Sequence, residues 1–239
     1  MSSWVMQELQ GVDLGDARLN SRLMKLVNDF AANPNASIPK ACGEWKATKA
    51  AYRFFDSEQV EPENILAAHI QSTVQRVKNH KTILITQDTT NLDFTKHPHT
   101  KNIGYLDSIF QRGLKVHSAL AVTTDGVPLG LIHQEILIRD PQNLGKKRER
   151  DKLATEEKES QRWLTALQKS QDAVPEEIHI IIVADREADI YDLFAAPRRP
   201  GVDLLIRGNH NRMISCRDDP DPPETTTHFK APNLKRSPK

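Results

Sequence analysis

The sequence has few of the features that mark secreted and membrane proteins. Only two cysteines, Cys42 and Cys216, occur among 239 residues, and they are too far apart in the chain to form a metal-binding motif. So few cysteines indicate a reducing compartment. No apolar run reaches the length needed to cross a bilayer, and residues 1–10 lack the basic start and apolar core of a secretory signal. We therefore expect no membrane partner.

Neither sign of charge dominates. The chain has 33 Lys and Arg against 32 Asp and Glu, a formal net charge of +1. Overall charge therefore does not identify a partner, and any surface for nucleic acid must be a local patch. The length suits one large domain, or a small domain followed by a medium one.

Two apolar runs that each end in an aspartate are the most informative feature present. They cover residues 83–88 (ILITQD) and 180–185 (IIIVAD). Continuous β-branched runs are typical of strands buried on both faces, so each predicts a strand whose carboxyl end carries Asp88 or Asp185. Two such ends side by side would bind a divalent metal, because Mg²⁺ prefers oxygen ligands. Either aspartate could instead cap the helix that follows it.

Three helices are predicted before the first strand, and two of them carry basic stripes. They begin at Asp16, at about Cys42 and at Pro62. A small DNA-binding bundle fits this pattern, although a solvated charged face is an equally simple interpretation. The first helix has Arg18, Arg22 and Lys25 on one face; the second has Lys46, Lys49 and Arg53 on one face and Trp45, Thr48, Tyr52 and Phe55 on another.

The order of the later elements predicts a mixed sheet. Asp125-Gly126 is a strong hairpin signal between two apolar runs. An antiparallel meander followed by a crossover helix and parallel strands is the plan of ribonuclease H-like folds, in which the first and fourth strands are parallel neighbours. Asp88 and Asp185 would then meet at one site. The predicted elements after the first strand are strands at 113–123 and 127–138, a helix at 152–170, a strand at 178–184, a helix at 188–194 and a strand at 202–206.

Two polar segments connect these elements. Residues 91–111 are too long for an ordinary connection and either pack near the site or are mobile. His97 and His99 in this segment have no partner at metal-ligand spacing. The basic residues at 146–150 form either a solvated loop or a contact with a phosphate backbone.

The acidic motifs resemble those of DDE transposases of the insertion-sequence type that includes the transposon-five transposase. The resemblance extends from about Leu14 to Asn211. Its most diagnostic part is Asp-Arg-Glu-Ala-Asp-Ile at 185–190. The other matching segments are 87–90 (QDTT), 14–18 (LGDAR), 50–54 (AAYRF), 116–118 (VHS) and 130–135 (GLIHQE).

The resemblance implies a function in DNA transposition. The family cleaves double-stranded DNA at the inverted-repeat ends of a transposon and joins the free 3′ hydroxyl to a target, with Mg²⁺ or Mn²⁺ as cofactor. It also implies a cytoplasmic, nucleoid-associated bacterial protein that pairs with a second copy or with a full-length transposase. The implied catalytic and metal-binding residues are Asp88 and Asp185, and the implied DNA-binding residues are Arg18, Arg22, Lys49, Tyr52, Arg53, Arg186 and Arg207.

The chain departs from the family at the third catalytic acid. In the family this acid is a Glu within a downstream Tyr…Arg…Glu…Lys motif, which is missing here. Glu187 and Asp189 are poor replacements for it. We therefore expect an incomplete enzyme with one face of its sheet uncovered. The expected divisions are a helical DNA-binding domain at 1–80, a partial ribonuclease H-like domain at 81–213 and a disordered, proline-punctuated tail at 214–239.

Two other functions fit the same sequence. A non-catalytic regulator derived from a transposase would bind transposon ends without cutting them. An unrelated metal-dependent nuclease could use the same fold. Loss of Mg²⁺-dependent nicking in Asp88→Ala and Asp185→Ala would indicate catalysis, and DNA binding that survives both substitutions would indicate the regulator.

Overall fold

The computed structural model describes residues 3–108, 110–140 and 159–210. The basic segment at 146–150, the first half of the helix expected at 152–170 and the tail expected at 214–239 lie outside these residues. No helix in the described ranges is long and apolar enough to cross a membrane.

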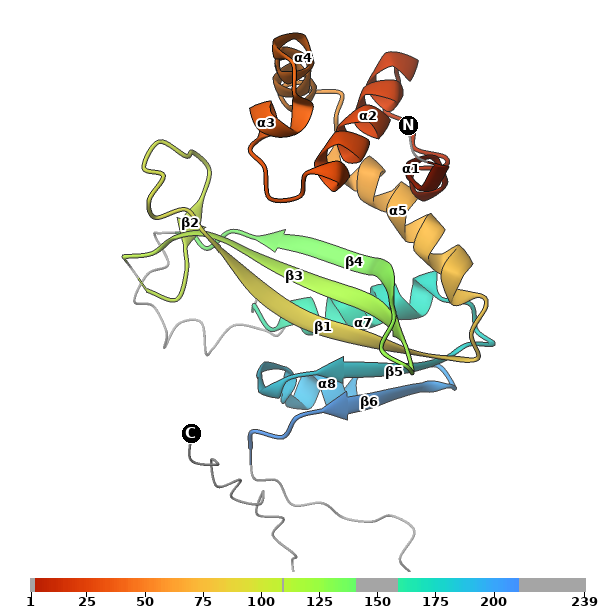
Figure 1. Cartoon of the computed structure of the whole chain (residues 1–239). Coiled ribbons are helices and arrows are strands. Elements are labelled where there is room, and N and C mark those ends of the chain that lie inside the picture. The colour runs from red at the N-terminus through yellow and green to blue at the C-terminus, as the bar shows by residue number, and fades with distance from the viewer. Residues whose placement is uncertain (1–2, 109, 141–158, 211–239) are drawn as a thin grey trace, which may run out of the picture.

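The N-terminal part is a group of helices around its own apolar core (Figure 1). The three predicted helices are confirmed as α2, α4 and α5, and α2 is capped by Asp16, whose carboxylate accepts the backbone N–H of Arg18 at 2.8 Å. Two short helices, α1 and α3, were not predicted, because one turn or so has too little periodicity to detect. The helices are α1 (Ser3–Glu8), α2 (Ala17–Ala32), α3 (Ile38–Cys42), α4 (Trp45–Phe55) and α5 (Pro62–Val77).

Helix α4 buries Phe54 and exposes its other three aromatic residues, Trp45, Tyr52 and Phe55. Its buried residues are Thr48, Ala51 and Phe54, whereas Trp45 is 79% exposed and Tyr52 47% exposed. Apolar residues occur on several sides of this helix, so its sequence fits more than one buried face. Contact with α2 and α3 decides which face is buried.

A six-stranded mixed sheet forms the rest of the described chain. Strand β3 pairs antiparallel with β1 on one side and with β4 and the short β2 on the other. Strand β5 pairs parallel with β1, as predicted for the two strands that lead to Asp88 and Asp185, and β6 pairs parallel with β5. The strands are β1 (Thr82–Asp93), β2 (Gly104–Tyr105), β3 (Arg112–Thr123), β4 (Pro128–Leu137), β5 (His179–Ala184) and β6 (Val202–Ile206).

The prediction that the first strand ends at Asp88 is wrong. Strand β1 continues to Asp93, because β3 pairs with it as far as Gly113. What ends beside Asp88 is the parallel pairing with β5, whose last pair is Gln87 with Ala184. Asp88 therefore lies within a strand that has lost one of its two neighbours.

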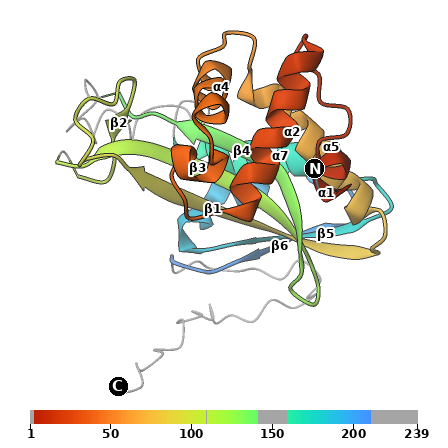
Figure 2. The ribbon, with the colours of Figure 1, turned by 45° about the horizontal axis from the view of Figure 1, so that its top comes forward.

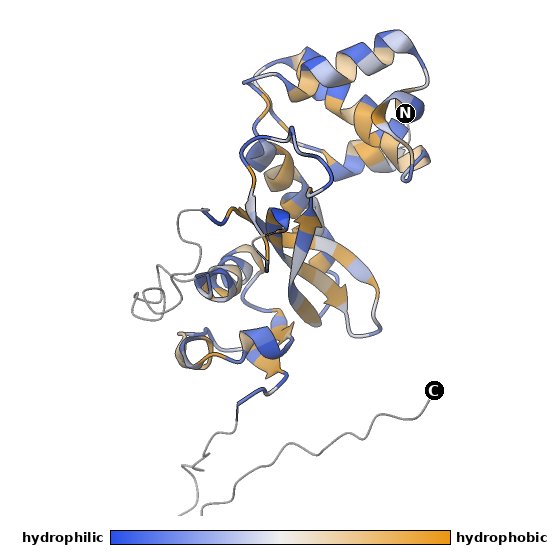
Figure 3. Cartoon of the chain, turned by 90° about the vertical axis from the view of Figure 1, so that its left-hand side faces the viewer, coloured by the Kyte–Doolittle hydropathy of each residue, from blue (hydrophilic) through white to orange (hydrophobic). Residues whose placement is uncertain are grey.

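One face of the sheet is covered by α7 (Gln161–Ala173) and α8 (Tyr191–Ala195). Trp163 and Leu167 of α7 pack there against Ile83 and Ile182 in the larger apolar core. In the side-on view of Figure 3 no described helix covers the opposite face, where Leu120 is only half-buried.

Candidate functional site

The sheet brings Asp88 and Asp185 next to each other. They directly follow Gln87 and Ala184, which are register partners in the parallel strands β1 and β5, and neighbouring strands lie about 4.8 Å apart. Both side chains are exposed. Two carboxylates thus face solvent where the parallel pairing of β1 with β5 ends. Such oxygen ligands would suit a divalent cation.

Asp185 also has the capping role that the sequence left open. Its carboxylate accepts the backbone N–H of Glu187 at 2.8 Å and begins the 3-10 turn Arg186–Ala188. A capping carboxylate keeps acceptor capacity for further partners. The capping hydrogen bond holds the aspartate in place and is compatible with a ligand role.

A polar row continues from Asp88 across the uncovered face. Asp88 pairs in register with Ser118 of β3, which pairs with Gln134 of β4. The amide of Gln134 donates a hydrogen bond to the Ser118 hydroxyl at 3.0 Å. Side chains of register partners lie on the same face of a sheet, so this row extends the polar surface of Asp88 toward β4.

The structure provides no third acid next to the pair among the residues it describes. No three His, Cys, Asp or Glu side chains of residues 3–108, 110–140 and 159–210 are grouped as a metal site. Glu187 pairs with Arg162 at 3.1 Å. Asp189 is buried and accepts the backbone N–H groups of Asn209 and His210 at 2.6 and 2.7 Å, which anchors the chain after β6. The two carboxylates suit Mg²⁺ in their chemistry, and water would complete the coordination.

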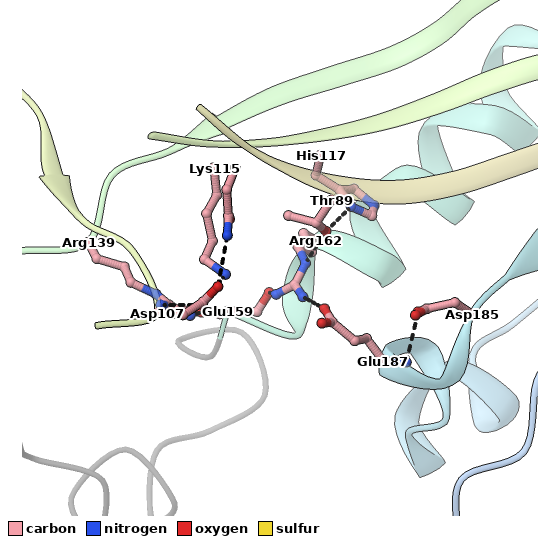
Figure 4. Close-up of polar contacts among 10 residues, drawn as sticks. Thr89, Asp107, Lys115, His117, Arg139, Glu159, Arg162, Asp185 and Glu187 are labelled. Carbon is pink, nitrogen blue, oxygen red and sulfur yellow. Dashed lines mark hydrogen bonds and ion pairs between the residues drawn. The ribbon is translucent and has the colours of Figure 1, made fainter. Parts of the chain in front are cut away.

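Arg162 connects three of the elements around this site (Figure 4). From the first turn of α7 its guanidinium donates to the hydroxyl of Thr89 at 3.0 Å, to the backbone carbonyl of Glu159 at 2.7 Å and to Glu187 at 3.1 Å. It also lies over the ring of Trp163, 5.3 Å from the centroid. Burial lowers the pKa of Arg162, and the carboxylates of Glu187 and Glu159 oppose this change. Arg162 was not predicted as a site residue, because its partner Thr89 is 73 residues away in the chain.

His117 lies behind Thr89 in the covered face. Its Nδ1 is 2.9 Å from the Thr89 hydroxyl and its ring meets Trp163 edge-on, with 4.6 Å between centroids. Burial, together with the positive charge of Arg162, lowers the pKa of His117 to about 4. The imidazole is therefore neutral at physiological pH, and it supports the position of Thr89 without adding charge to the site.

A second ionic network lies beside Arg162 at the far end of β1. The Arg139 guanidinium pairs with Glu159 at 2.6 Å and with Asp107 at 3.2 Å. Lys115, nearly buried, also reaches Asp107, at 2.7 Å. The hydrogen bond from Lys115 is the main reason that the pKa of Asp107 is lowered to about 2. Through Glu159 this network is continuous with Arg162 (Figure 4).

The five DNA-binding residues expected in the N-terminal part lie on two helices. On α4 the side chains of Lys49, Tyr52 and Arg53 are exposed, beside the exposed Trp45. On α2 Arg22 is half-buried, and Arg18 is exposed with its guanidinium 2.8 Å from Asp16. An exposed ion pair of this kind is weak, so Arg18 stays available to a phosphate.

The other two expected DNA-binding residues lie near the aspartates. Arg186 follows Asp185 directly and is exposed. Arg207 follows β6 and its backbone N–H donates to the carbonyl of Ala184, the residue before Asp185. The two arginines and the two aspartates therefore occupy the same edge of the sheet, whereas Lys49 and Arg53 belong to the helical part.

Comparison with known families identifies the helical part. Residues 1–60 match the family model described as transposase DNA-binding. The matched region contains α1–α4, and therefore Arg18, Arg22 and the exposed side chains of α4. The match supports a transposase whose N-terminal domain binds DNA.

Proposed function

We propose that this chain is a DDE-type transposase of the insertion-sequence kind that binds transposon ends through α2 and α4. The observation that carries the proposal is the combination of a transposase DNA-binding region with Asp88 and Asp185, which directly follow the last parallel pair, Gln87 with Ala184. A meander followed by two parallel strands supports a ribonuclease H-like assignment for the sheet.

Asp88 and Asp185 would be the first two carboxylates of the active site. They would hold Mg²⁺ or Mn²⁺, which activates the attacking water or hydroxyl and stabilises the leaving oxyanion in phosphodiester cleavage. Arg162 links Thr89, the residue after Asp88, to Glu187, two residues after Asp185. Arg186 and Arg207 would contact phosphates of the DNA beside the scissile bond, which orients the strand without reading its sequence.

Glu187 and Asp189 both have structural partners, which supports an active site that lacks its third acid among the described residues. Glu187 is paired with Arg162, and Asp189 is buried under the chain that leaves β6. Two carboxylates without a third support one of two functions. The chain either binds transposon ends and cleaves them poorly, or is a regulator that competes with a complete transposase for the ends. The second function differs from the first only in the absence of strand cleavage.

DNA binding and nicking by the full chain test the proposal. We expect Lys49→Glu with Arg53→Glu to weaken binding to a duplex of about 40 base pairs by tenfold or more, because each lost phosphate contact reduces the electrostatic part of affinity. The matched charge reversals Lys78→Glu, at the C-cap of α5, and Lys169→Glu, on α7, should leave binding unchanged. Failure of the unmodified chain to bind duplex DNA would overturn the proposal.

Nicking of a supercoiled plasmid in Mg²⁺ or Mn²⁺ separates the enzyme from the regulator. Any nicking should disappear in Asp88→Asn and in Asp185→Asn, while both variants still bind DNA. Asparagine keeps the cap at residue 185, so loss of activity there does not reflect loss of the turn. Nicking that survives both substitutions would rule out a role for the two aspartates, and binding without nicking in the unmodified chain would identify the regulator.

A further inference from the structure

The strands β1 and β3 extend past the candidate site as a ribbon. On the far side of β3, β4 borders this ribbon as far as the pair of Lys115 with Leu137, and β2 borders it at Arg112 and Gly113. Strand β1 continues five residues beyond Asp88, to Asp93, with only β3 as its neighbour. At about 3.4 Å per residue the ribbon projects roughly 17 Å past the aspartate. Figures 1 and 2 show it at the left, ending in the turns around β2, which we call the ribbon tip (residues 94–108 and 110–111).

Specific contacts hold the ribbon tip in one conformation. The Arg112 guanidinium donates to the carbonyls of Pro98 and Thr100, at 3.3 Å each. Leu106 is buried, and its backbone N–H bonds the carbonyl of Gln111 at 2.9 Å. Asp107 is anchored to the sheet by the network with Lys115 and Arg139 described above. The ribbon tip therefore has a fixed position relative to Asp88.

The outer surface of the ribbon tip carries lysines and an exposed aromatic ring. Lys96 and Lys101 are exposed, and neither forms an ion pair with another described residue. Asp107 is paired with two cations. Asp93, at the base, accepts the N–H of Thr95 at 2.8 Å and keeps its negative charge, which attracts Lys96 without forming an ion pair with it. Phe110 is 80% exposed. A single exposed apolar side chain is common on protein surfaces, so Phe110 is informative only together with the two exposed lysines of the same segment.

The same combination of side chains occurs on α4. There the exposed Trp45 lies among Lys49 and Arg53 in the region that matches transposase DNA-binding proteins. Lysines that contact phosphates and an aromatic ring that packs on a sugar or an unpaired base are the means by which proteins bind DNA without sequence preference. The ribbon tip and α4 thus both have side chains suited to binding DNA, and each would contact a different part of the same duplex.

We infer that the ribbon tip is a second DNA contact. The N-terminal helices hold one segment of the duplex, the duplex then runs past Asp88 and Asp185, and the ribbon tip binds it there. This inference rests on the function proposed above. Lys96 and Lys101 contact the phosphate backbone, and Phe110 packs against a deoxyribose or a base at the distorted cleavage position. The contact orients DNA at the site and does not read its sequence.

Fluorescence anisotropy on the full chain tests the inference. The probe is a labelled duplex of about 40 base pairs and arbitrary sequence, measured between about 50 and 200 mM NaCl. The double variant Lys96→Ala/Lys101→Ala should bind more weakly, and its slope of log Kobs against log salt should be shallower by about 1.8, which corresponds to two phosphate contacts. Phe110→Ala, measured on the same duplex with a short unpaired segment, should lose about fivefold or more in affinity with little change in slope.

The controls separate this inference from the proposed function. The exposed pair Lys78→Ala/Lys169→Ala should leave affinity and slope unchanged. If Lys49→Glu/Arg53→Glu weakens binding while the ribbon-tip variants keep the slope and affinity of the unmodified chain, the ribbon tip does not contact DNA and the proposed function stands. If the unmodified chain does not bind the duplex, both fail. Equal melting temperatures across the set show that each variant is folded.

Discussion

The imidazole of His69 on α5 accepts a hydrogen bond from the backbone N–H of Leu131 on β4, with 2.9 Å between the nitrogens. Its other nitrogen lies against the carboxylate of Glu8 in α1. An imidazole that accepts at Nε2 must be unprotonated there. One histidine thus joins the first helix, the last helix of the N-terminal part and the sheet.

Replacing this histidine should destabilise the protein. His69→Leu removes both hydrogen bonds and leaves the N–H of Leu131 unpaired in a partly buried position, which costs about 1–3 kcal/mol of unfolding free energy. Urea denaturation measures the loss. His179→Leu is the control, because His179 makes only an exposed pair with Asp203 at 2.8 Å and should change stability by less than about 0.5 kcal/mol. Equal effects at the two positions would show that His69 does not join these elements.

Gly130 should tolerate no side chain. It has a φ of +138°, and an added Cβ would lie 2.2 Å from the hydroxyl oxygen of Thr73 on α5. Gly130→Ala therefore adds backbone strain and separates β4 from α5, with an expected loss of about 2–4 kcal/mol. Gly208→Ala, where the added atom meets nothing within 4 Å, should be close to neutral. A melting temperature for Gly130→Ala equal to that of Gly208→Ala would contradict this close packing.

Arg139 and Arg18 should differ in their contributions to stability although each pairs with a carboxylate. Arg139 is largely buried and forms two hydrogen bonds of 2.6 Å to Glu159. Arg139→Leu leaves that carboxylate unpaired at a half-buried position and should cost about 2–4 kcal/mol. Arg139→Lys should recover only part of the loss, because an ammonium cannot replace the planar two-pronged contact.

The exposed pair between Arg18 and Asp16 is the matched control for Arg139. The Arg18 side chain is 91% exposed, so Arg18→Leu should leave the unfolding free energy nearly unchanged. Denaturant unfolding of the three variants under one set of conditions measures the difference. A loss for Arg18→Leu as large as that for Arg139→Leu would show that burial does not govern these pairs.

His117 should make stability depend on pH between about 4 and 6.5. Its pKa is lowered to about 4 in the folded protein from an ordinary value near 6.5. Between these values the unfolded state binds the extra proton, so the unfolding free energy decreases as pH falls from 6.5 to 4, by up to about 3 kcal/mol in total. Above pH 6.5 this contribution is constant.

The variant His117→Phe isolates this effect, because it retains a ring beside Trp163 but cannot titrate. Denaturant unfolding at several pH values should show the unmodified protein losing more stability than the variant between pH 6.5 and 4. Parallel curves for the two proteins would mean that His117 is not held neutral in the fold.

Much of the fold could be predicted because its signals are local. Continuous β-branched runs identified β1 and β5, Asp125-Gly126 identified the hairpin between β3 and β4, and an aspartate identified the start of α2. The parallel pairing of β1 with β5 followed from the order of elements. Adjacent positions for Asp88 and Asp185 were therefore expected before any coordinates, although their role as metal ligands stays a prediction.

Other features depended on contacts between residues far apart in the chain. The buried face of α4 could not be chosen, because apolar residues occur on several of its sides and only packing on α2 and α3 selects Phe54 over Trp45. The length of β1 depended on its partner β3. The ribbon tip was predicted only as a long polar connection, since its order comes from Asp107, Lys115 and Arg139.

The candidate site shows the same division. Hydrophobic periodicity and helix capping are properties of neighbouring residues, so the amino-acid sequence alone determined the strands that carry Asp88 and Asp185. Tertiary packing decided that Arg162 meets Thr89, that Glu187 is paired and that Asp189 is buried beneath the chain after β6. Those contacts join segments that meet only when the sheet and α7 assemble. A buried charge requires a partner, so the partner is set by which segments are buried together and not by proximity in the chain.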